Sequence, residues 1–181
     1  MKKIIFTLVI IYLVLIIIFE GYFRSYPSIP IYPNNYQDLE IMKKEMNKRN
    51  KNDIDFFYKT NESVVYAFIP FVNDKLEDLI KISHSHNHII FFFKNLINRK
   101  RPYQIDTNLL PLSTKTARTP AYPAGHAYQA LLVAKYLSSK YPEKKKLFND
   151  IAFRCDDCRV KAGIHYKSDG DFSRKIFKYF N

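Results

Sequence analysis

Apolar residues recur at helical spacing over most of the chain after residue 35, and the longest such pattern runs from about residue 73 to residue 100. Steps of three and four residues place these side chains on one face, so the pattern predicts a long helix with a broad buried side. Asn73 or Asp74 stands where an N-cap is expected. Pro102 should end this helix, because proline lacks the N–H that a further turn needs.

The rest of the C-terminal half is divided by proline and glycine. Proline is favoured in the first turn of a helix and glycine just past its end, so these residues mark boundaries. The pattern predicts a loop over residues 111–123, a helix from just after Pro123 to about Pro142, a helix over residues 143–162 that ends near Gly163, and a short helix over residues 172–180.

The chain before residue 73 is harder to assign. Residues 24–35 contain three prolines and are predicted to form an extended linker. Residues 36–52 have a thin apolar stripe typical of a surface helix, and residues 53–71 fit either a strand or a helix. The whole pattern predicts an all-α fold, a helical bundle over residues 36–181 whose strongest helices are antiparallel.

The first 23 residues have a different character, because residues 4–19 form an almost unbroken apolar stretch. Sixteen helical residues span ~24 Å, which the flanking residues extend toward the ~30 Å of a bilayer core. The chain lacks the small residues of a signal-peptidase site, which favours an uncleaved membrane anchor over a cleaved signal peptide. Lys2 and Lys3 precede the stretch, so the positive-inside rule predicts a single-pass protein with residues 24–181 outside the cytoplasm.

Composition and charge limit the class of protein. The chain has 181 residues, a formal net charge of +12 and 47% hydrophobic residues. This content is enough for a core and excludes a disordered chain, and two cysteines are too few for a disulfide scaffold. A basic chain suits nucleic acid, an anionic membrane or a phosphorylated substrate, and it also fits a lysine-rich solvated surface.

Three clusters of residues at predicted helix ends suit phosphate chemistry. They are Lys94-x6-Arg101-Pro102, Pro123-Ala124-Gly125-His126 and Arg159-x5-His165-x3-Asp169. Arginine forks onto two phosphate oxygens and lysine adds a point charge, which suits the stabilisation of a phosphoryl group during transfer. Taken alone, the first cluster is common as surface charge, the second as a turn, and the third as a structural histidine–carboxylate pair. Their occurrence together, in order, favours a phosphate site.

The spacing within these clusters predicts individual roles. His165 and Asp169 are four residues apart, so on a helical turn the carboxylate reaches one imidazole nitrogen and leaves the other free to attack. Gly125 stands at a helix start, where its backbone N–H can approach an anion. His126 is then placed to protonate the leaving alkoxide.

The three motifs resemble those of the type 2 phosphatidic-acid phosphatase superfamily, which includes bacterial class A acid phosphatases and vanadium haloperoxidases. The resemblance covers about residues 90–170 and implies a helical bundle of that type, working as a ping-pong phosphatase with no metal or other cofactor. It implies His165 as the nucleophile that becomes phosphohistidine, Asp169 as the residue that orients it, and His126 as the acid. The residues implied to hold the phosphate are Lys94, Arg101, Arg159 and the Gly125 amide.

Two positions depart from the usual motifs of that superfamily. Ala124 and Cys158 each stand where the superfamily usually has serine. The loss of a hydroxyl donor at residue 124 could cost ~1–3 kcal/mol of transition-state binding if nothing replaces it. A weakened or retuned enzyme is therefore expected more than an inactive one.

Cysteine and histidine also form patterns outside these motifs. Cys155 and Cys158 are spaced as in a redox motif, but they fall late in a predicted helix, which favours two buried free thiols over a redox pair. A local disulfide is the alternative outside the cytosol. His84, His86 and His88 would share one face of a strand and could bind metal there, but they diverge on a helix, so no metal site is expected.

The sequence therefore favours a membrane-anchored phosphatase that acts on a phosphorylated small molecule or a lipid phosphate, with membrane contact through residues 4–23. Residues 175–180 alternate basic and aromatic side chains, which we interpret as a helix with one buried face or as a membrane-facing edge rather than a nucleic-acid site. Two alternatives stay open: a vanadate-dependent haloperoxidase, whose known members are usually much larger, and a membrane-tethered relative that binds phosphate without turnover. The sequence does not indicate an oligomeric state.

Overall fold

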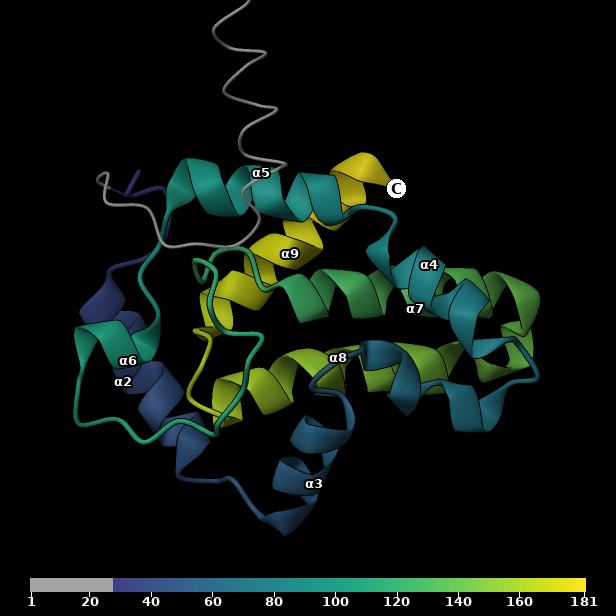
Figure 1. Ribbon diagram of the computed structural model, residues 1–181, viewed down its shortest axis with the longest axis horizontal. Helices are drawn as coiled ribbons and strands as arrows, with labels where there is room; N and C mark the ends of the chain where they lie inside the picture. Colours follow the sequence, from purple (N-terminus) through teal and green to yellow (C-terminus); the bar gives the residue numbers. More distant parts are fainter. Residues whose placement is uncertain (1–27) are drawn as a thin grey trace, which may run out of the picture.

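The computed structural model describes residues 28–181, which form a helical bundle without strands in this range (Figure 1). The membrane anchor predicted for residues 1–23 lies outside the described residues. Within residues 28–181, every helix is too short or too polar to cross a bilayer. The predicted all-α class is confirmed for the described part of the chain.

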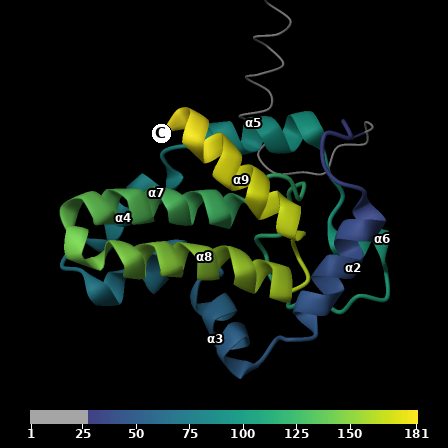
Figure 2. The ribbon, with the colours of Figure 1, turned by 180° about the vertical axis from the view of Figure 1, so that it is seen from behind.

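The centre of the fold is an antiparallel pair of helices, α7 (Gly125–Lys140) and α8 (Lys145–Lys161), joined by the short 3-10 turn η3 (Pro142–Lys144). Val133 and Leu137 of α7 and Phe148 of α8 belong to the largest buried apolar cluster. Helices α7 and α8 run side by side through the middle of both views (Figures 1 and 2). The two helices predicted on either side of Pro142 are therefore confirmed, as is the loop that precedes α7.

The long helix predicted over residues 73–100 is wrong, because the chain breaks there into α4 (Leu76–His84) and α5 (Asn87–Ile97). Polar side chains cause the break: the Ser85 hydroxyl donates to the carbonyl of Ile82 (2.8 Å), and the His86 ring meets the Tyr128 hydroxyl on α7 (3.0 Å). The apolar pattern continues across the break because α4 and α5 both pack against α7.

The predicted ends of that helix are also wrong. Lys75 occupies the N-cap of α4 without a side-chain bond, and Asp74 is instead ion-paired with Lys140 of α7 (2.7 Å). At the other end, α5 stops at Ile97 because Asn98 takes a left-handed conformation (φ 52°). Pro102 begins the short helix α6 (Pro102–Ile105) rather than ending α5.

The N-terminal segment is helical throughout its ambiguous part. Helix α2 (Asn35–Met46) is shorter than predicted, and α3 (Lys51–Lys59) begins anew because Asn50 and Asp53 form a capping box. The 3-10 turns η1 (Val64–Ala67) and η2 (Ile69–Phe71) follow, so a helical interpretation of residues 53–71 is correct.

The C-terminal helix α9 (Lys167–Phe180) starts five residues earlier than predicted. Its early start reflects Asp169, whose carboxylate accepts from the backbone N–H of Tyr166 (2.9 Å) at the helix N-cap. Helix α8 ends just before Gly163, as expected, and this glycine has φ +77°, where a side chain would be strained. The turn at Gly163 brings residues 164–166 back toward the bundle, ahead of α9 (Figure 2).

Candidate active site

A cavity of about 190 Å³ lies at the N-terminal end of α7, between the α4–α5 junction and the segment before α9. Five of the seven residues singled out from the motifs line it. They are Lys94, Arg101, Gly125, His126 and His165. The fold therefore brings residues that are up to 71 positions apart in the sequence onto one wall, through α5, the turn before α6, the start of α7 and the turn before α9.

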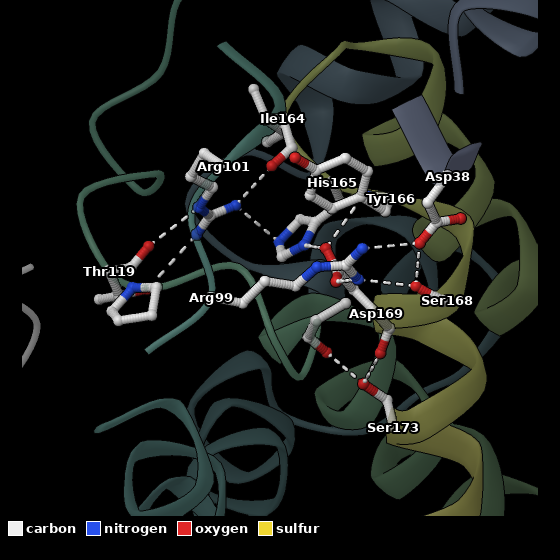
Figure 3. A network of polar contacts seen from close by, with 12 residues as sticks. Asp38, Arg99, Arg101, Thr119, Ile164, His165, Tyr166, Ser168, Asp169 and Ser173 are labelled. Atoms are coloured by element: carbon white, nitrogen blue, oxygen red, sulfur yellow. Dashed lines mark hydrogen bonds and ion pairs between the residues drawn. The ribbon is translucent and has the colours of Figure 1, made fainter. Parts of the chain in front are cut away.

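His165 is held in one tautomer by its two neighbours (Figure 3). Its Nδ1 lies 2.8 Å from Oδ2 of Asp169, and its Nε2 lies 2.8 Å from Nη1 of Arg101. A guanidinium can only donate, so Nε2 is the acceptor and Nδ1 carries the proton that Asp169 accepts. Burial, with the positive charges of Arg101 and Lys94, lowers the pKa of His165 well below its usual value. The imidazole is therefore neutral, with its lone pair on Nε2.

Asp169 lies behind His165, away from the cavity wall, and is fully buried. Burial raises its pKa to about 6, although Arg99 and the Tyr166 N–H act in the opposite direction. The predicted contact between His165 and Asp169 is present, but not on a helical turn as expected. His165 precedes α9 and Asp169 sits in its first turn, so the helix start itself aligns the pair.

Arg99 is the main site residue that the sequence reasoning missed. Its guanidinium is fully buried and donates to Oδ1 of Asp169 (2.7 Å) and Oδ2 of Asp38 (2.8 Å), which joins α2 to α9 (Figure 3). The ring of Tyr166 lies 3.9 Å from its central carbon. The sequence does carry a signal for it, because Arg99 is one of three consecutive basic residues. The motif spacing drew attention only to the third of them, Arg101.

Arg101 and Lys94 supply positive charge to the cavity and are themselves almost fully buried. Arg101 donates to the carbonyls of Thr119 (2.9 Å) and Ile164 (2.7 Å) as well as to His165. Lys94 donates to the carbonyl of Pro120 (2.5 Å). Burial lowers the pKa of Arg101 to about 10 and that of Lys94 as well, so both side chains would gain from an anion between them.

His126 stands on the first turn of α7 and faces the same cavity. Its Nε2 lies 3.0 Å from the carbonyl of Asn61, which can only accept, so Nε2 carries a proton. Burial and the charge of Arg159 lower its pKa well below the usual value. Proton exchange with a bound substrate would therefore use Nδ1.

Gly125 opens α7, and Ala124, at the N-cap, makes no side-chain hydrogen bond to the first turn. A Cβ at residue 125 would meet Cγ2 of Ile90 at 3.6 Å and Cε of Lys94 at 3.9 Å. Both distances are ordinary van der Waals contacts, and Gly125 lines the cavity. The serine hydroxyl that the resembling motif usually supplies is absent at Ala124.

Arg159 does not line the cavity. Its guanidinium points into the C-terminal end of α3, where it donates to the hydroxyl (3.1 Å) and carbonyl (2.5 Å) of Thr60. It also reaches the sulfur of Cys158 (3.2 Å). The residue stays close enough to contribute to the lowered pKa of His126 and His165, but its hydrogen bonds go to α3.

The other patterns in the sequence lie around this site. Cys155 and Cys158 are both buried and free, as favoured. His84 lines the cavity, while His86 occupies the N-cap position of α5 without a side-chain bond to that helix. Within residues 28–181, no three histidine, cysteine or acidic side chains come together as potential metal ligands.

The outer wall of the cavity holds polar residues that no motif pointed to: Glu62, Asn87 and Gln129. Gln129 on α7 donates to Oδ1 of Asn87 on α5 (2.9 Å), which ties the two walls together. Ile90 and Phe91 give the same wall an apolar part. The cavity thus has a cationic inner end and a mixed outer end.

Comparison with solved structures finds a related fold. The chain is similar to a transmembrane PAP2-type phosphatidylglycerolphosphate phosphatase from Bacillus subtilis, with a TM-score of 0.54 and 20% sequence identity over 96% of this chain and 91% of that one. This likeness confirms, at the level of the fold, the resemblance that the three motifs predicted. No protein-family model and no curated protein sequence matches the chain.

Proposed function

We propose that this protein is a phosphatase of the PAP2 type, which hydrolyses phosphate monoesters, including lipid phosphates, through a phosphohistidine intermediate. The observation that carries the proposal is the arrangement of His165 at the cavity wall, with Nδ1–H on Asp169 and the Nε2 lone pair on Arg101, which lines the same cavity together with Lys94. A neutral, oriented imidazole beside two cations is what an in-line attack on a phosphate ester requires.

In the first step, Nε2 of His165 attacks phosphorus and the bond from phosphorus to the ester oxygen breaks. The phosphate takes the place of Nε2 as the acceptor for Arg101, and Lys94 and the Gly125 N–H hold its remaining oxygens. The negative charge of the bound phosphate favours a second proton on His126, at Nδ1, and this proton goes to the leaving oxygen, so an alcohol departs and His126 is left neutral with its remaining proton on Nε2. Asp169 keeps its charge and stabilises the positive imidazole as the new bond forms.

In the second step, water attacks phosphorus and the bond from phosphorus to Nε2 of His165 breaks, which returns the lone pair to Nε2. Nδ1 of His126 accepts a proton from the water, and inorganic phosphate is released. The proposed steps use no metal. The charges of Lys94, Arg101 and Arg159, with the amide of Gly125, would stabilise the negative charge on the phosphoryl oxygens. Arg159 would assist from behind the wall through its charge, because its hydrogen bonds hold it on α3.

A lipid phosphate is the substrate class that the chain's features favour. The solved relative is a transmembrane phosphatidylglycerolphosphate phosphatase, and residues 4–19 of this chain form an apolar stretch. We infer that residues 1–23 anchor the chain, that residues 24–35 link the anchor to the domain of residues 36–181, and that the domain lies outside the cytoplasm.

The experiment that tests the proposal is hydrolysis of p-nitrophenyl phosphate by the full chain in mild detergent with EDTA. Turnover should persist in EDTA, be blocked by vanadate, and fall at least about 10³-fold in His165→Ala. His88→Ala is the matched control, because that histidine is exposed and lies off the cavity. Brief acid-free denaturation during turnover should trap phosphate on wild-type protein and none on His165→Ala.

Two outcomes would refute parts of the proposal. Turnover unchanged in His165→Ala would remove the assigned nucleophile. Vanadate binding to a folded wild-type chain without turnover on p-nitrophenyl phosphate, phosphatidic acid or phosphatidylglycerolphosphate would indicate a binding protein instead.

A further inference from the structure

One edge of the molecule, along α5 and the end of α9, exposes large apolar side chains. Phe92 on α5 is 37% exposed, and Tyr179 and Phe180 at the end of α9 are 88% and 51% exposed. Ile29, at the start of the described chain, is exposed as well. We call these residues the α5–α9 edge. Large apolar residues gathered on one surface are a sign of an interaction site.

Contacts hold the parts of this edge together along α5. The backbone N–H of Ile29 donates to the carbonyl of Ile97 (3.0 Å) at the C-terminal end of α5. At the other end of α5, the side-chain amide of Asn181 donates to the Tyr128 hydroxyl (3.2 Å), beside His86. In both views, α5, the end of α9 and the start of the described chain form the same edge, opposite α3 (Figures 1 and 2).

The charges on the edge favour an anionic partner. Lys175 and Lys178 are exposed on α9 between the aromatic residues. The acidic side chain on that helix's exposed side, Asp171, is already paired with Arg174 (2.7 Å). Lysine interleaved with phenylalanine and tyrosine is typical of helices that lie in a bilayer interface, where the rings enter the headgroup region and the ammonium groups meet lipid phosphates.

The path of the chain gives an independent reason to choose a lipid surface. The apolar stretch over residues 4–19 is separated from Ser28 by residues 20–27. A fully extended chain of that length reaches at most about 30 Å. Whatever bilayer the apolar stretch enters must therefore lie within about that distance of the α5–α9 edge, where the described chain begins.

We propose that the α5–α9 edge is a membrane-docking surface that rests on an anionic bilayer. Phe91 faces the cavity and Phe92 faces outward, so successive residues of α5 form the cavity wall and the docking surface. Docking by this edge sets the cavity wall against the headgroups, where a lipid phosphate would enter. The link to lipid substrates rests on the proposed function, whereas the docking itself does not.

The chain contains no tryptophan, so a single introduced tryptophan reports one position without background. The full chain is reconstituted into vesicles of phosphatidylcholine and phosphatidylglycerol, as Phe92→Trp or Phe180→Trp. Each should lose about half of its emission when the lipids carry bromine near the glycerol end of their acyl chains, because the rings would sit in the headgroup–acyl boundary. The double variant Lys175→Gln/Lys178→Gln should weaken this quenching, most clearly at low salt.

Tyr58→Trp is the matched control, because Tyr58 is 50% exposed on α3, at the opposite edge. It should be quenched by aqueous acrylamide and not by brominated lipid. Equal lipid quenching at positions 58, 92 and 180, or none at 92 and 180, would overturn the proposal. Protection of positions 92 and 180 from acrylamide without lipid quenching would also overturn it, because a protein or a second copy would then cover the edge. Fluorescence needs no turnover, so failure here is distinct from failure of the proposed phosphatase activity.

Discussion

Replacement of Arg99 by methionine removes a buried charge that holds two carboxylates. The Arg99 guanidinium is fully buried and donates to Asp38 (2.8 Å), Asp169 (2.7 Å), Ser168 (2.7 Å) and Asn35 (3.0 Å). Methionine fills similar space but leaves both carboxylates without their partner. Breaking a buried ion pair from one side costs about 3–5 kcal/mol, because the remaining charge stays in the interior.

The assay is thermal denaturation of the full chain in detergent, followed by circular dichroism. A loss of 1 kcal/mol lowers Tm by about 2–4 °C for a domain of this size, so Arg99→Met should lower Tm by about 6–20 °C. Lys146→Met is the control. It removes the ion pair of Lys146 with Asp150 (2.6 Å), which is as short as the pairs of Arg99 but is largely exposed. Such a pair contributes about 0–1 kcal/mol. Asp38→Asn added to Arg99→Met should restore part of the loss, since one carboxylate is no longer left charged.

Arg99 also acts through Asp169 on the nucleophile, and this role has its own readout. Arg99 is the strongest influence that lowers the pKa of Asp169, against the burial that raises it to about 6. Without Arg99 that pKa rises, so Asp169 becomes protonated at a higher pH and no longer stabilises the positive imidazole. The acid limb of the activity profile should therefore move to higher pH in Arg99→Met. A Tm no lower than that of Lys146→Met, or a profile that does not move, would refute this reasoning.

Three further predictions concern glycine packing and buried titratable groups. Gly170→Ala should lower Tm by several degrees, because its Cβ would clash with the carboxylate of Asp156. Gly125→Ala meets its nearest atom at 3.6 Å and should leave Tm almost unchanged, so equal Tm values for the two variants would contradict the clash. Burial raises the pKa of Asp156 to about 6. Between about pH 4 and pH 6 the folded state therefore keeps a proton that the unfolded state has released. The contribution of Asp156 to the free energy of unfolding falls as pH rises through this range. Wild type should therefore lose about 1 kcal/mol relative to Asp156→Asn between pH 5 and pH 7, and parallel unfolding curves would show the pKa to be normal. Burial and nearby cations lower the pKa of His165, so the acid limb of kcat/KM for p-nitrophenyl phosphate should lie below pH 6.5 and follow the protonation of Asp169; an acid limb near 6.5 that does not move in Arg99→Met would argue against a neutral buried nucleophile.

Local signals predicted the C-terminal half of the fold well. Pro142 and Gly163 set the limits of α8, and the apolar spacing of α7 and α8 is confirmed by their packing. The same signals failed between residues 73 and 100, because one apolar face can belong to one helix or to two helices that pack on the same neighbour. The contact of His86 with Tyr128 and the ion pair of Asp74 with Lys140 decide between them, and both partners lie more than 40 residues away.

The sequence by itself identified most of the residues that line the candidate site, because phosphate binding requires particular residue types and a short spacing can be recognised without a fold. Lys94, Arg101, Gly125, His126 and His165 meet on one cavity wall as the motifs predicted. Only the tertiary structure decided which charges face the cavity and which support it. Arg159 turns to the end of α3, and Arg99 joins Asp38 to Asp169. The physical reason is that a buried charge must find its partners wherever packing places them, and those partners lie on helices far apart in the sequence.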